Sequence, residues 1–68
     1  MSVVKVTEIS SSSPKSFEDA INTGIARASQ TLRDITGAWV NEQKVVVENG
    51  RVTAYRVNMK ISFRLEDG

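Results

Sequence analysis

The sequence predicts an α+β fold of the order β-α-β-β, in which a three-stranded antiparallel sheet curls round one helix. Three observations predict it. A run rich in β-branched residues opens the chain, an apolar stripe with helical spacing follows, and Asn49-Gly50 divides the last third into two segments of strand character. One helix between the first strand and a hairpin then gives this element order.

The first strand is expected over residues 3–9. The segment contains Val3, Val4, Val6, Thr7 and Ile9, and β-branched side chains favour strands. Four serines follow at 10–13 and lead into a proline, which is typical of a polar connection. We therefore expect a loop there, ahead of the helix.

Two starts are open for the helix. Ser13 would serve as N-cap if Pro14 occupied the first helical position. Ser16 would serve equally well, because Glu18 and Asp19 would then lie in the first turn, where acidic side chains stabilise the helix dipole. The residues themselves do not choose between the two.

The body of the helix is marked by apolar residues at spacings of three, four and seven. These are Phe17, Ala20, Ile21, Gly24, Ile25, Ala28, Leu32 and Ile35. The small side chains in this stripe would allow a sheet to approach closely, which compensates for the poor helix propensity of Gly24. We expect the helix to end near Asp34, before Gly37.

A long hairpin is expected to complete the fold, with strands over 36–48 and 51–66. Asn-Gly favours a two-residue type I′ turn, which needs positive φ at both positions. Alternation in the last strand puts apolar residues from Tyr55 to Leu65 on the helix side and polar residues on the other. An up-down-up-down path gives the sheet order 1-3-2. Both strands of the hairpin are longer than one helix can cover. The uncovered parts of these strands should therefore pack on neighbouring subunits.

The hairpin register predicts which side chains share the sheet face turned away from the helix. With the turn at Asn49-Gly50, paired positions sum to 99, so Trp39 faces Lys60 and Gln43 faces Arg56. By the same rule, Asn41 faces Asn58 and Glu48 faces Arg51.

Two features of that face have alternative interpretations. Trp39 either packs in a subunit interface or stacks on a flat ligand. The basic row Arg56, Lys60 and Arg64 is either a solvated strand face or a site for phosphate or carboxylate.

Composition excludes several classes of function. The 68 residues contain neither cysteine nor histidine, which removes disulfides, thiol nucleophiles, Ser–His triads and most zinc sites. A net charge of +1 gives no electrostatic case for nucleic acid as partner. We see no catalytic constellation and do not expect an enzyme. No apolar run is long enough for a membrane span, and residues 1–5 lack signal-peptide features, so a cytoplasmic protein is expected.

A chain this short is expected to form a single domain, residues 1–68, with a marginal core. Small domains without disulfides or metal often gain burial by oligomerisation. The expected partner is therefore a further copy of the chain.

Three segments together resemble the dodecin family. They are residues 4–9 with Ser13-Pro14, residues 20–28 with Thr31-Leu32-Arg33, and the ending 55–67. The resemblance covers nearly the whole chain and implies a dodecin-like domain that assembles into a hollow homododecamer. It also implies a flavin ligand (riboflavin, FMN or FAD).

The chain departs from the family at the flavin site. Gly37 stands where flavin-binding dodecins carry a stacking Trp, and Arg56 stands where they carry a Gln that bonds the ring edge. Trp39 lies two residues further along, on the same strand face. These departures predict weak riboflavin binding or none. Residues 40–43 and 55–56 look more like a calcium-associated dodecin subgroup, although that likeness assigns no metal ligands.

The leading hypothesis is a non-catalytic homododecameric shell that binds or stores a small ligand. The alternatives are a dodecin-like assembly that binds calcium or an anionic small molecule, or a purely structural assembly. The candidate ligand-binding residues are Gly37, Trp39, Gln43, Arg56 and Lys60.

Overall fold

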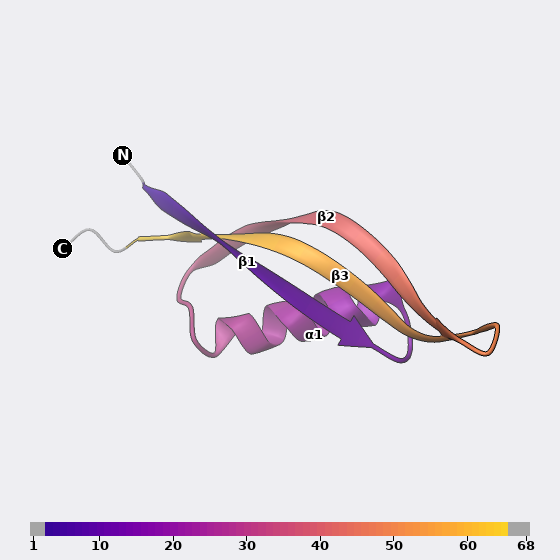
Figure 1. The fold of residues 1–68 in the computed structure, drawn as a ribbon. Helices are drawn as coiled ribbons and strands as arrows, with labels where there is room; N and C mark the ends of the chain where they lie inside the picture. Colours follow the sequence, from indigo (N-terminus) through magenta and orange to yellow (C-terminus); the bar gives the residue numbers. More distant parts are fainter. Residues whose placement is uncertain (1–2, 66–68) are drawn as a thin grey trace.

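The computed structural model describes residues 3–65 and confirms the predicted fold. The elements are β1 (Val4–Ser13), α1 (Phe17–Ser29), β2 (Ile35–Glu48) and β3 (Arg51–Arg64). The strands form one antiparallel sheet in the order β1-β3-β2, as predicted. Figure 1 shows α1 lying along one side of this twisted sheet. The last strand was expected to reach Glu66, which lies outside the described residues.

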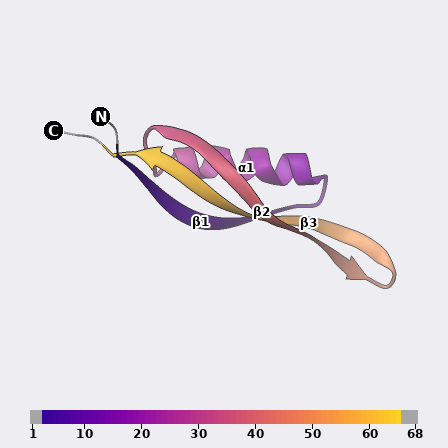
Figure 2. The ribbon, with the colours of Figure 1, turned by 90° about the horizontal axis from the view of Figure 1, so that it is seen from above.

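The first strand is longer than predicted, because the serine run is strand and not loop. Ser10 to Ser13 continue β1 and pair in register with Asn58 to Tyr55 of β3. The central strand supplies backbone partners along this whole length, and that pairing outweighs the turn preference of serine. Figure 2 shows the chain leaving the end of β1 and turning toward the start of α1.

Ser16 is the N-cap of α1, which settles the open helix start. Its Oγ accepts a hydrogen bond from the Asp19 backbone N–H at 2.9 Å. Ser13 has a different task, since its Oγ donates to the Asp19 carboxylate at 2.6 Å and accepts from the Lys15 N–H at 2.9 Å. This buried serine therefore joins the end of β1 to the first turn of the helix.

The helix ends at Ser29, earlier than the predicted end near Asp34. A turn follows, in which the Leu32 N–H still bonds the Ala28 carbonyl at 2.8 Å. Asp34 then takes a φ of 57°, a left-handed conformation that a right-handed helix does not contain. Its carbonyl accepts the Arg64 N–H at 3.0 Å, which fixes the entry into β2 against β3.

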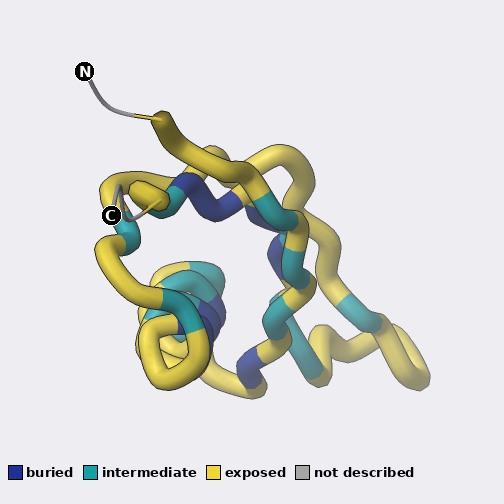
Figure 3. The backbone as a smooth tube through the Cα atoms, turned by 90° about the vertical axis from the view of Figure 1, so that its left-hand side faces the viewer, coloured by how far each residue is buried: buried dark blue, intermediate teal, exposed yellow. Residues whose placement is uncertain are grey.

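The core lies between α1, β1 and β3, as the apolar stripe and the alternation predicted. Ala20, Val57, Met59 and Ile61 are fully buried. Around them pack Ile9, Phe17, Ile21, Ile25, Leu32 and Ile35. Figure 3 shows the buried positions of the helix facing those of the sheet. Phe63 was also expected in this core, but it is only partly buried.

The helix leaves β2 uncovered beyond Ile35. It packs against β1 and β3, and the hairpin tip projects beyond it (Figure 1). Large apolar side chains consequently stay exposed on the hairpin, among them Val45, Val47 and Val52. Among residues 3–65, no helix has the length and apolar character to cross a membrane.

Candidate ligand-binding face

The sheet has a second face, opposite α1, which we call the outer face. Side chains alternate along a strand, and directly paired residues of antiparallel strands share a face. Because Val57, Met59 and Ile61 are buried under the helix, Arg56, Asn58 and Lys60 point outward. Their partners complete three rows across β1, β3 and β2. The rows are Glu8–Lys60–Trp39, Ser10–Asn58–Glu42 and Ser12–Arg56–Lys44.

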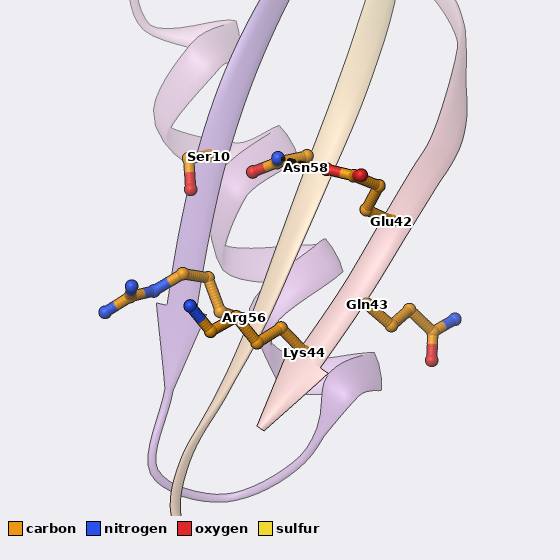
Figure 4. Close-up of a pocket in the computed structure, with 6 residues that line it drawn as sticks. All are labelled: Ser10, Glu42, Gln43, Lys44, Arg56 and Asn58. Atoms are coloured by element: carbon orange, nitrogen blue, oxygen red, sulfur yellow. Dashed lines mark hydrogen bonds between the residues drawn. The ribbon is translucent and has the colours of Figure 1, made fainter. Parts of the chain in front are cut away.

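The predicted hairpin register is right next to the turn and again from Val40 to Gly37, and it is wrong between these two parts. Trp39 pairs with Lys60 and Glu48 with Arg51, as predicted. Gln43, however, pairs with Val57, and Lys44 stands opposite Arg56. Figure 4 shows the consequence, because the Gln43 side chain points away from the group formed by the others.

Two compensating β-bulges cause this error. Near the turn, Thr53 has no counterpart on β2, so the pairing shifts by one residue between Val46 and Val47. At Asn41 an extra residue on β2 restores the original register. A one-residue shift moves each side chain to the other face of the sheet. Glu42 thus takes the place predicted for Asn41, opposite Asn58.

A hollow of about 700 Å³ lies on the outer face at the shifted segment. Its lining residues come from all three strands and are Ser10, Glu42, Gln43, Lys44, Arg56 and Asn58 (Figure 4). Two side-chain hydrogen bonds organise the surroundings. The Asn58 Nδ2 donates to the Glu42 Oε1 at 2.9 Å, and the Arg56 Nε donates to the Ser12 Oγ at 3.0 Å. We call this hollow the polar pocket.

A second hollow, of about 460 Å³, adjoins Trp39. It is lined by Val6, Trp39, Asn41 and Lys60. The indole is 58% exposed, so a flat molecule has access to the ring. Lys60 supplies a cation directly opposite it. We call this hollow the Trp39 pocket.

The predicted site residues do not form one site in the structure, because they are divided between the two pockets and a position outside both. Trp39 and Lys60 meet in the Trp39 pocket, whereas Arg56 and Gln43 belong to the polar pocket. Lys60 and Arg56 are four residues apart on β3, which is roughly 13 Å along a strand. Gly37 lies in neither pocket, one row beyond Trp39, opposite Ser62.

Gly37 sits beside a small hydroxyl cluster. Ser62 Oγ donates to the Gly37 carbonyl at 3.2 Å and lies 3.1 Å from the Thr36 hydroxyl. A Cβ built at residue 37 would meet only the Ser62 Oγ, at 3.5 Å, which is an ordinary contact. A Cβ is therefore sterically compatible with this position within one subunit.

Sequence reasoning missed Lys44, Glu42, Asn58 and Ser10 as residues of one pocket. The available signal was the succession of four polar residues at 41–44, which breaks the alternation of a strand. Such a break is typical of a bulge. Ser10 was missed because the serine run was taken for a loop.

The described residues give little support for a metal site within one subunit. Across residues 3–65, no three carboxylates gather closely enough to hold a metal ion. Glu42 is the single carboxylate of the polar pocket, and Asn58 already binds one of its oxygens.

Comparison with known proteins identifies what the chain is similar to. The family model described as Dodecin matches residues 3–66. The chain is 37% identical over 65 residues to a protein of Mycobacterium tuberculosis named Calcium dodecin, covering 96% of this chain and 92% of that protein.

Solved structures of dodecins are also similar to this chain. A dodecin from Streptomyces davaonensis superposes with a TM-score of 0.93 at 36% identity, covering 97% of each chain. The Mycobacterium tuberculosis calcium dodecin, described as calcium chelating with a novel calcium-binding site, superposes with a TM-score of 0.82 at 33% identity. That match covers 97% of this chain and 94% of the other.

Proposed function

Because the chain belongs to the dodecin family, we propose that it forms the subunit of a non-catalytic homododecameric shell that binds a small ligand. Residues 1–68 would act in it as one dodecin-like domain. The observation that carries the ligand-binding role is the outer face, where two hollows lie side by side on one sheet and are lined by an exposed indole and several cations.

Assembly is supported by the surface that the subunit leaves uncovered. The central core contains four fully buried apolar residues, while β2 carries apolar side chains with no helix over them. Val47 is 56% exposed and Val40 39%. Covering such side chains with another copy would add the apolar burial that a chain of this length lacks.

The Trp39 pocket supports a flat ligand, and flavin is the ligand that the family resemblance implies. Gly37 supplies no ring, so stacking must use Trp39, one row away. Arg56 donates hydrogen bonds but cannot accept one, unlike a glutamine. Its guanidinium also already donates to Ser12. These differences favour a flat ligand other than riboflavin, or riboflavin held weakly.

Calcium is the second candidate, favoured by the relative named Calcium dodecin and by the calcium-binding site in its structure. Calcium needs six to eight oxygen ligands. Because the described part of one subunit gathers no carboxylate cluster, we place the ion where copies meet, so that several subunits supply its oxygen ligands. Glu42, with one oxygen bound by Asn58, is the pocket residue best suited to contribute.

Native mass spectrometry tests both candidates on the assembled protein. We expect a complex of twelve copies. It should carry bound mass either as purified, from a flat ligand, or after exchange into calcium, and little or none after exchange into riboflavin. Substituting Trp39 by Leu should abolish binding of a stacked ligand and leave calcium unaffected. Glu42→Gln should do the reverse. A shell that retains neither added mass under any condition would contradict the binding role.

A further inference from the structure

We propose that Asn49 is a site of covalent self-modification, at which the Asn49-Gly50 peptide closes to a succinimide and reopens as aspartate or isoaspartate. The two residues form the turn between β2 and β3, with φ values of 53° and 76°. Both are exposed, and Figure 1 shows this tip projecting beyond α1. Neither residue lines the two hollows of the outer face, so the site is independent of the proposed ligand-binding role.

The reaction uses atoms of the turn itself and water. The Gly50 backbone nitrogen gives up its proton to solvent and attacks the Asn49 Cγ, so that a nitrogen–carbon bond closes a ring. Such an attack is intramolecular and needs no second reactant at this step. The Cγ–Nδ2 bond breaks, and Nδ2 takes a proton from solvent and leaves as ammonia. Water then opens the ring at Cγ, which gives aspartate, or at the Asn49 backbone carbonyl, which gives isoaspartate.

The attacking nitrogen is free and unshielded. The pair nearest to the turn is Glu48 with Arg51, so the Gly50 N–H lies outside the hydrogen-bond ladder. Among residues 3–65 it donates to no other backbone carbonyl. Gly50 has no side chain, and a Cβ built there would meet no atom within 4 Å. The attack therefore displaces no packed group and breaks no backbone hydrogen bond of the described chain.

The other three asparagines of the chain are held more firmly. Asn22 lies in α1, Asn41 in β2 and Asn58 in β3, and each is followed by a residue with a side chain. The Asn58 amide also donates to Glu42 at 2.9 Å. Ring closure requires rotation of the backbone after the asparagine, which within a helix or strand disrupts the element. At Asn49 it requires only local opening of the hairpin tip, and such openings cost little free energy.

The modification changes the charge of the subunit. Nine basic and eight acidic residues give a formal net charge of +1 at pH 7, so one added carboxylate makes nine against nine and a net charge of zero. Proteins without net charge associate and precipitate more readily. Isoaspartate also adds a carbon to the main chain, which a two-residue type I′ turn does not accommodate. Conversion of Asn49 would thus make the subunit more acidic and alter the hairpin tip.

Peptide mapping by mass spectrometry tests the proposal on the assembled protein, held in mildly alkaline buffer and sampled over time. We expect Asn49 to convert several-fold faster than Asn22, Asn41 and Asn58. Conversion should be slower in mildly acidic buffer, because the attacking nitrogen must lose a proton. Both aspartate and isoaspartate should form, and isoelectric focusing of the unfolded chain should show one added negative charge.

Asn49→Gln is the matched control, since it keeps the amide but would have to close a larger ring, and it should gain no acidic form over the same time. Conversion of Asn49 no faster than that of the other asparagines would overturn the proposal. So would an Asn49 that stays intact in the assembled protein and converts only in denaturant, because the tip would then be shielded. Aspartate without isoaspartate would indicate direct hydrolysis of the amide and would overturn it too. The mass of the native complex tests the proposed shell separately.

Discussion

Gly24 of α1 lies so close to Met59 of β3 that a Cβ at residue 24 would stand 2.9 Å from the Met59 Cε. The same atom would stand 2.9 Å from the Cβ of Ser11 on β1. The methionine end can move, but the serine Cβ is tied to the backbone of its strand. The glycine is therefore what allows the helix to approach the sheet.

Gly24→Ala should destabilise the subunit by up to about 2 kcal/mol, because overpacking costs about 1–3 kcal/mol and the gain in helix propensity returns only roughly 1 kcal/mol of it. Denaturant unfolding at a fixed protein concentration measures this. Ala26→Gly, on the exposed side of the same helix, is the matched control and should cost only the propensity difference of about 1 kcal/mol. A Gly24→Ala variant more stable than the parent would contradict the close packing.

Ser16→Ala should lower the free energy of unfolding by about 1 kcal/mol, because the Asp19 N–H loses its capping acceptor. Ser29→Ala removes a hydroxyl that bonds the Ile25 carbonyl at the exposed far end of the helix. That variant should change stability by no more than a few tenths of a kcal/mol, since such a bond is not a cap. Equal losses in the two variants would show that Ser16 does not cap the helix.

Asp34 has a left-handed backbone, which glycine adopts without steric cost and β-branched residues resist. Asp34→Gly should leave stability within about 1 kcal/mol of the parent, whereas Asp34→Val should cost at least about 1–2 kcal/mol. Thermal unfolding of both variants measures this. The substitution Arg33→Val at the exposed neighbouring residue is the control, because it removes a surface charge without placing valine in a left-handed backbone conformation. A valine variant as stable as the glycine variant would be inconsistent with this conformation.

Riboflavin should bind the unmodified protein weakly or not at all, and Gly37→Trp combined with Arg56→Gln should improve binding. The first change adds a stacking ring at a position where a Cβ makes only an ordinary contact within the subunit. Such a ring is worth about 1–3 kcal/mol. The second restores a side chain that both donates and accepts. Quenching of riboflavin fluorescence measures the affinity, with each single variant as control. Tight, stoichiometric quenching by the unmodified protein would contradict the prediction and would show that Trp39 already provides the stacking ring.

Local patterns in the sequence predict much of this fold. The helical stripe, the Asn49-Gly50 turn and the alternation of β3 are each encoded within a few neighbouring residues. The turn residues indeed have φ values of 53° and 76°. The extension of β1 through Ser13 was not predictable in this way, because it depends on pairing with Tyr55 to Asn58 of a strand more than forty residues away.

The candidate site was predicted less completely than the fold, for a geometric reason. Trp39 and Lys60 were placed correctly because the effects of the bulges at Thr53 and Asn41 cancel before that pair is reached. Between the two bulges the faces are exchanged, so Gln43 was chosen in place of Lys44. Uniform alternation contains no information on where an extra residue is inserted, and only the polar run at 41–44 indicates the place.

The mass of the native complex tests the central claim most directly, because both pockets are proposed to act within a closed shell of identical subunits. Native mass spectrometry of the purified protein in neutral buffer should give twelve copies of the 7.5 kDa chain, a complex of about 90 kDa before any ligand is added. A predominant species of 7.5 kDa at the same protein concentration would contradict the account.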